Sequence, residues 1–268
     1  MSRDVDTTYR SPHATAHALR LNLLAVYLFL YAPILLLVVF SFNASRVSAV
    51  WRGFTLEWYG KLLRDRDLWN ACWNSLVVAG AATVVATTIG TLAALALERY
   101  RFPGRTTFTS VLYLTVIAPE IIMAISLLLF YARIQLELGL LTIIIAHVAF
   151  NISFVTLVVQ ARLRDFDWRL TEAAMDLGAT PASTFFRVTL PLIFPGVLGG
   201  ALLAFTLSID DFVITFFTAG PRATTLPLRV YSMVKFGVTP EINALSTLLL
   251  LNSIVLVLLS LKAQRYGK

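Results

Sequence analysis

The chain has 268 residues, of which 58% are hydrophobic and 14% are charged, and its mean hydropathy is +0.77. This composition excludes an ordinary soluble domain. The net charge of +7 could suggest a nucleic-acid partner, but the basic residues flank apolar runs, as membrane orientation signals do. Because Cys72 is the only cysteine, an intrachain disulfide and a multi-cysteine metal site are excluded.

Six apolar runs predict an all-α, polytopic membrane protein, because helices satisfy their backbone polar groups within one segment of hydrocarbon. The predicted spans are residues 21–42, 74–97, 107–131, 139–161, 193–217 and 245–262. They form one transmembrane domain over 21–262, between an N-terminal tail (1–20) and a C-terminal tail (263–268). A cleaved signal peptide is the alternative for the first run, but that run is too long for one and contains Pro33.

The loop between the first two spans, residues 43–73, carries four tryptophans, as is typical of an aromatic belt at a membrane interface. Leu56, Tyr59, Leu62 and Leu63 recur in it at helical spacing. This periodicity predicts a short helix inside the loop.

The distribution of Lys and Arg predicts that both termini lie in the cytoplasm. In this orientation 13 of the 22 Lys and Arg residues lie on the cytoplasmic side, and the short turn 98–106 has three arginines. The polar segment 162–191, between the fourth and fifth spans, is then cytoplasmic as well.

Three carboxylates lie inside predicted spans, where ionisable groups are costly and are functional candidates. Glu120 belongs to the third span, and Asp210 and Asp211 belong to the fifth. A rise of about 1.5 Å per residue places Glu120 about 20 Å and Asp210 about 26 Å from the cytoplasmic ends of their helices. No basic residue lies in the interior of a span, so this patch favours a cationic substrate. The alternative is that the carboxylates cap a broken helix or bond to neighbouring polar groups.

The surroundings of these carboxylates predict further details. Pro119 predicts a local kink beside Glu120. Adjacent Asp210 and Asp211 would point about 100° apart on one helix, so we expect one of them to face the substrate path.

Other polar and aromatic side chains in the spans are secondary candidates. His147 and Asn151 share a face of the fourth span, and we expect them to hydrogen-bond between helices rather than to line a route. The three histidines are scattered and give no metal site. Phe205 and Tyr131 are candidate cation–π partners by type and depth alone.

The cytoplasmic segment 162–191 predicts two short helices. Gly178 can take the left-handed conformation that ends the first helix. Thr180 and Pro181 supply an N-cap and an N1 proline for the second. Glu172 and Asp176, four residues apart, share one face and can pair with basic residues.

This segment resembles the EAA loop of ATP-binding-cassette (ABC) importer permeases. The resemblance is carried by Glu172, Ala173, Ala174, Gly178, Leu190 and Pro191, with Val188 where the family usually has Ile. It implies a MetI-like permease fold whose segment docks into a groove of a separate ATPase, mainly through Glu172 and Gly178. The chain has no phosphate-binding loop, so we expect ATP and Mg to be used by that ATPase and no cofactor to be bound by this chain.

From about residue 21 the chain is similar to the C-type permeases of spermidine/putrescine importers. The similarity rests on residues 118–126, 208–212 and 226–245, with Glu120 where close relatives are expected to have Asp. It implies a bacterial inner-membrane subunit, not an enzyme, that moves polyamines with a second homologous permease, an ATPase dimer and an external binding protein. The alternatives are an ABC permease for an amino-phosphonate, iron or an opine, and an ATP-independent transporter.

The external segment 218–244 is too polar and too interrupted to be a span. Thr239, Pro240 and Glu241 predict the start of the sixth helix. By the resemblance, this segment faces the binding protein; a plain connector is the alternative.

Overall fold

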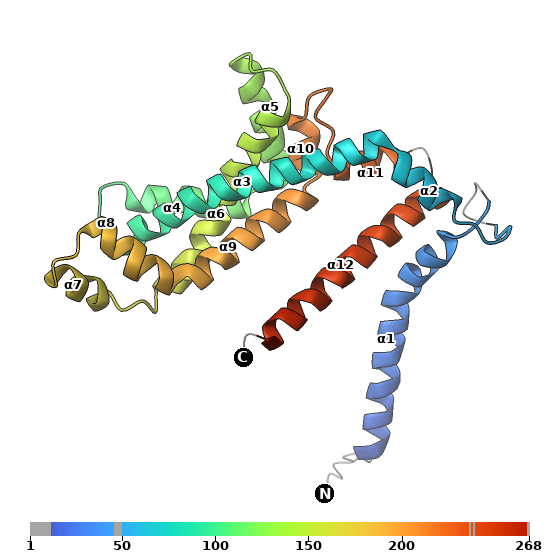
Figure 1. The fold of residues 1–268 in the computed structure, drawn as a ribbon, viewed down its shortest axis with the longest axis horizontal. Helices are drawn as coiled ribbons and strands as arrows, with labels where there is room; N and C mark the ends of the chain where they lie inside the picture. The colour runs from blue at the N-terminus through green and yellow to red at the C-terminus, as the bar shows by residue number, and fades with distance from the viewer. Residues whose placement is uncertain (1–11, 46–49, 236, 238, 267–268) are drawn as a thin grey trace, which may run out of the picture. The chain divides into compact units, whose positions relative to one another are not determined.

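The computed structural model of the chain describes the backbone of residues 12–45, 50–235, 237 and 239–266, and side chains within 19–255 of these. The described chain is helical, with one isolated bridge between Asn43 and Phe54, so the all-α prediction is confirmed. It divides into two compact units, residues 1–65 with 233–268 and residues 66–232 (Figure 1).

The unit at the chain ends holds three helices: α1 (Pro12–Phe40), α2 (Glu57–Arg64) and α12 (Pro240–Tyr266). α12 packs against both α1 and α2. α2 confirms the short helix predicted in the tryptophan-rich loop, and α12 begins at the predicted Pro240. Trp58 of α2 is buried, and its indole N–H donates to the carbonyl of Asn43 at 2.8 Å, so this tryptophan fixes the loop onto α2.

Three long helices form the centre of the second unit: α3 (Arg66–Arg99), α6 (Leu140–Leu163) and α9 (Leu190–Asp210). They pack against one another side by side (Figure 1). Val155 of α6 lies against Gly90 of α3 and Gly200 of α9; a Cβ on these glycines would be 2.8 Å and 3.2 Å from its nearest Val155 atom. Small residues at such crossings let helices approach closely, which is how helices associate in membranes.

Shorter elements complete the second unit. They are α4 (Arg105–Ile117), α5 (Glu120–Arg133), α7 (Arg169–Asp176), α8 (Pro181–Thr184), α10 (Val213–Thr218) and α11 (Leu226–Lys235), whose last residues belong to the other unit. α10 packs against α5 and α6.

The third predicted span is broken. α4 and α5 are bent by 112° at the Ala118–Pro119 junction, so the expected local kink exists and is much sharper than a proline kink alone. With 13 and 14 residues, each helix is only about 20 Å long, which is less than the hydrocarbon thickness of about 30 Å.

Four described helices are long and apolar enough to cross a membrane, and the bent α4–α5 pair can count as a fifth. The four are residues 19–40, 66–99, 140–163 and 181–210. α12 lies at the sixth predicted span, with an apolar stretch described over Pro240–Val255.

The fifth predicted span, 193–217, differs at both ends. It ends early, because α9 stops at Asp210 and α10 starts at Val213. It also begins early, because a helix runs from Pro181 to Asp210 through a π-helical turn at Phe185–Thr189. This wider turn accommodates Pro191, whose ring would otherwise meet the carbonyl four residues before it. The second helix predicted in segment 162–191 and the fifth predicted span are therefore one helix.

Candidate functional site

Both helix breaks border one cavity. Its volume is about 350 Å³, and it is lined by residues from α4, α5, α6, α9 and α10. Glu120, Asp210 and Asp211 all lie on its wall. The predicted convergence of the third- and fifth-span carboxylates is therefore present in the structure, although their role in transport stays a prediction.

Glu120 and Asp210 carry the accessible charges of this cavity. Glu120 opens α5 directly after Pro119, and Asp210 is the last residue of α9; both are exposed. Neither makes a hydrogen bond or ion pair with another described residue. Glu120 lies in the first turn of α5, next to the positive end of the helix dipole.

Asp211 is held quite differently, because its side chain is only 7% exposed. One carboxylate oxygen accepts from the backbone N–H and the hydroxyl of Thr215, both at 2.7 Å, and the other accepts from the N–H of Ile214 at 3.4 Å. Asp211 lies in extended backbone after α9 and caps α10. The expectation that Asp210 and Asp211 share one helix is therefore wrong, and the helix-capping alternative holds for Asp211.

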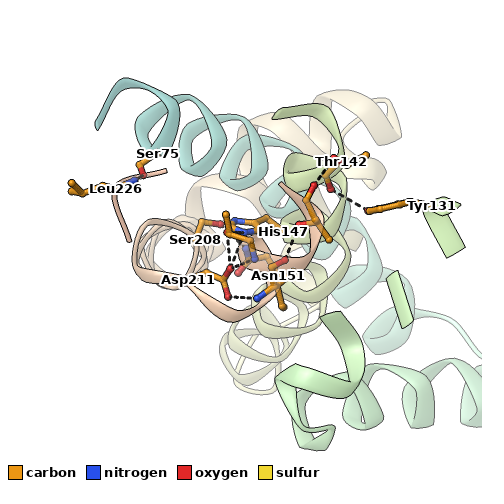
Figure 2. A network of polar contacts seen from close by, with 11 residues as sticks. Ser75, Tyr131, Thr142, His147, Asn151, Ser208, Asp211 and Leu226 are labelled. Carbon is orange, nitrogen blue, oxygen red and sulfur yellow. Dashed lines mark hydrogen bonds and ion pairs between the residues drawn. The ribbon is translucent and has the colours of Figure 1, made fainter. Parts of the chain in front are cut away.

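The histidine and asparagine of α6 bond to the two segments on either side of this break (Figure 2). His147 Nε2 lies 3.0 Å from Thr215 Oγ1 and 3.3 Å from the Asp211 carboxylate. Asn151 Nδ2 donates to Ser208 Oγ at 2.9 Å. The predicted hydrogen bonding of this pair between helices is confirmed.

Sequence reasoning missed Ser208 and Thr215. The available signal is their spacing, since Ser208, Asp211 and Thr215 recur three and four residues apart, which would place them on one helix face. The helix is in fact broken between them.

The structure does not place the two aromatic candidates on this cavity wall. Tyr131 is buried and its hydroxyl donates to the carbonyl of Thr142 at 3.1 Å, away from the cavity wall. Phe205 does not line the cavity either. The aromatic side chains on the wall are Phe150, Phe154 and Phe212.

Segment 162–191 has the predicted local structure. α7 is followed by Gly178 in the left-handed conformation (φ +90°), whose N–H donates to the Met175 carbonyl at 2.9 Å. Thr180 caps α8 by accepting from the N–H of Ser183 at 3.2 Å, and Pro181 is the first helical residue.

One face of this segment is anchored and another is presented outward. Thr171 is fully buried. Trp168 packs on the core cluster of α3, α6 and α9, and the Arg99 guanidinium lies 5.4 Å from its ring centre. Leu177 is 90% exposed. The residues that carry the resemblance to the EAA loop lie on or near the exposed face of this segment. Glu172, Ala173, Gly178 and Pro191 are exposed, and Ala174 and Leu190 are half-buried.

Residues 86–267 match the protein family described as binding-protein-dependent transport system inner membrane component. The chain belongs to this family. Its members are transport components of the inner membrane rather than enzymes, which favours the importer over the ATP-independent transporter.

Similar curated proteins extend the match over most of the chain. The putrescine transport system permease protein PotI of Escherichia coli K12 is 47% identical over 85% of this chain and 84% of its own length. The spermidine/putrescine transport system permease protein PotC of the same strain is 44% identical over 88% and 89%. PotC of Haemophilus influenzae is 43% identical over 88% and 91%.

Solved structures share the fold at low sequence identity. A chain of a bacterial ABC transporter that imports the acidic polysaccharide alginate superposes with a TM-score of 0.74 at 20% identity, covering 96% of this chain and 99% of that chain. A chain of the MetNI methionine ABC transporter gives 0.59 at 19% identity, covering 79% and 97%. These likenesses confirm the predicted MetI-like permease fold.

Proposed function

We propose that this chain is the permease subunit through which an ATP-driven importer moves polyamines across the bacterial inner membrane. The observation that carries the proposal is the cavity at the two helix breaks, where Glu120 and Asp210 present negative charge without a basic partner among the described residues. A dication such as putrescine, or a longer polyamine, supplies the missing positive charges, and an anionic cargo is disfavoured by both carboxylates.

The wall chemistry fits the rest of a polyamine as well. Between its ammonium groups a polyamine is a chain of methylene groups, and Met123, Phe150 and Phe154 border the cavity beside the carboxylates. Aromatic faces also attract ammonium groups. The similar proteins named as putrescine and spermidine/putrescine permeases agree with this choice of cargo.

Energy would enter through the cytoplasmic segment. A partner ATPase dimer would bind ATP and Mg and receive the outer face of α7, with Glu172, Gly178 and the exposed Leu177 at the contact. One helix connects this segment to the cavity, because it runs from Pro181 to Asp210. Its 30 residues span about 45 Å, so a displacement at the ATPase would reach the carboxylate directly.

The complete importer would contain a second, homologous permease, the ATPase dimer and an external polyamine-binding protein, all within or against membrane lipid. Both termini and the segment 162–191 would face the cytoplasm, as the arginine-rich turn 98–106 indicates. The external segment around α11 would face the binding protein.

Uptake by the reconstituted complex tests this proposal. Proteoliposomes loaded with ATP are given labelled putrescine or spermidine, and matched vesicles receive a non-hydrolysable ATP analogue. We expect saturable uptake of at least one polyamine, and only in vesicles with ATP. An excess of a neutral diol, or of a dicarboxylate, should not reduce this uptake. Uptake that is insensitive to polyamine competition, or that proceeds for an anionic solute instead, would refute the choice of cargo.

A further inference from the structure

We propose that α6 acts as a clamp across the break between α9 and α10, and that this clamp positions Asp210 for the cargo. The clamp consists of His147, Asn151, Ser208, Asp211 and Thr215, and Figure 2 labels the first four of them. His147 is then a positioning residue, which acts through Asp210 without touching the cargo. The inference rests on the proposed function only where it refers to cargo binding.

The geometry of the clamp comes from two residues one helical turn apart. Asn151 bonds to Ser208, which lies two residues before the end of α9. His147 bonds to Thr215, which lies in the first turn of α10. The two arms therefore hold both sides of the break against the same face of α6, and they fix the path of the backbone between them.

Asp211 closes the clamp from within. Its carboxylate contacts His147 on α6 as well as Thr215 on α10. Asp211 is thus occupied by the protein, whereas Asp210, one residue earlier and exposed on the cavity wall, is not. Since Asp210 ends α9 at the break, any change in the break would reorient its carboxylate.

Stability alone explains this arrangement poorly. His147 and Asn151 are 1% and 0% exposed, yet His147 Nδ1 and Asn151 Oδ1 have no hydrogen-bond partner among the described residues. Buried polar atoms without partners are costly, and hydrogen bonds between membrane helices contribute modestly. Apolar side chains would hold α6 against α9 at less cost. A polar clamp instead fixes one geometry of the break, and so holds Asp210 in one position.

Transport kinetics test the clamp through KM. His147→Leu removes the arm to α10, and His147→Gln keeps a donor near the Nε2 position. Thr156→Val is the matched control, since Thr156 is also buried on α6 but bonds to Gly90 and Ile152, away from the break. We expect His147→Leu to raise KM at least about fivefold, His147→Gln to recover most of that loss, and Thr156→Val to leave KM within about twofold.

The same variants in an Asp210→Asn background identify the route of the effect. If the clamp acts through Asp210, His147→Leu raises KM by less than about twofold when it is compared with the Asp210→Asn protein alone. An unchanged KM in His147→Leu, or an equal increase in both backgrounds, would overturn the proposal. Should His147→Leu fail to assemble, Ser208→Ala removes the other arm without stranding Asp211, and the same outcomes apply.

A readout without cargo separates this inference from the proposed function. The parent protein carries Asp210→Cys, and Cys72, the chain's only native cysteine, is replaced by serine. The rate at which a cationic thiol-reactive reagent labels the new cysteine is measured in the assembled complex. We expect Ser208→Ala to change the labelling rate at least about threefold and Thr156→Val to leave it unchanged. Equal rates in all three proteins would refute the clamp, whatever the cargo proves to be.

Discussion

Replacing Gly178 by arginine tests whether segment 162–191 docks onto the ATPase. Gly178 is in the left-handed conformation (φ +90°), and a Cβ there would meet nothing within 4 Å. The substitution therefore adds backbone strain and an outward-pointing side chain, with no internal clash. Left-handed strain for a residue other than glycine is about 1–2 kcal/mol, which is about 5–30-fold in a local equilibrium.

Gly104 provides a matched control for that strain. It also has a left-handed backbone (φ +88°), and a Cβ there also meets nothing within 4 Å, but it lies in a different turn, directly before α4. Gly178→Ala and Gly104→Ala then measure strain alone, and Gly178→Arg and Gly104→Arg add the same bulk at two places.

The assay is co-purification of the ATPase together with ATP-driven uptake. We expect both alanine variants to assemble with a moderate loss of uptake. We expect Gly178→Arg to lose both ATPase binding and uptake, and Gly104→Arg to resemble its alanine variant. Normal ATPase binding and uptake by Gly178→Arg would refute docking at this segment. An equal loss in Gly104→Arg would show that strain, and not docking, is responsible.

Two further substitutions test local packing and capping. Gly220→Ala would place a Cβ on the carbonyl oxygen of Leu138, so we expect thermal unfolding to show a loss of about 1–3 kcal/mol or more in stability. The control is Gly139→Ala, which should be tolerated because a Cβ there meets nothing within 4 Å. Equal stability of the two variants would contradict the contact. Thr180→Ala removes the acceptor for the Ser183 N–H, so we expect about 0.5–2 kcal/mol less protection of that amide in hydrogen exchange. Thr180→Ser keeps a hydroxyl and should retain the protection. No difference between the two variants would contradict the cap.

The elements that sequence reasoning predicted are those determined locally. The left-handed Gly178 and the Thr180–Pro181 helix start depend on residue types within one turn, and α2 follows from apolar spacing. The rise per residue predicts a similar depth for Glu120 and Asp210, and both residues line one cavity in the structure.

The helix breaks could not be predicted from residue types within one turn or from apolar spacing. No glycine or proline marks the end of α9 at Asp210, and the break is stabilised by His147, which lies more than 60 residues earlier in the chain. The 112° turn between α4 and α5 likewise exceeds what Pro119 predicts. α5 packs against α10, a long-range contact that the local sequence does not predict. Conversely, the predicted start of the fifth span at residue 193 is not a helix boundary, because one helix runs from Pro181 to Asp210 through a π-helical turn.

The most direct test of the central claim is to neutralise the two accessible carboxylates one at a time. Glu120→Gln and Asp210→Asn keep size and hydrogen-bonding capacity but remove charge. Hydrogen bonds to charged groups contribute about 1.5–3 kcal/mol, so each variant should raise KM for putrescine or spermidine about 10–100-fold while ATPase binding stays intact. An unchanged KM in both variants would contradict a cation path through this cavity.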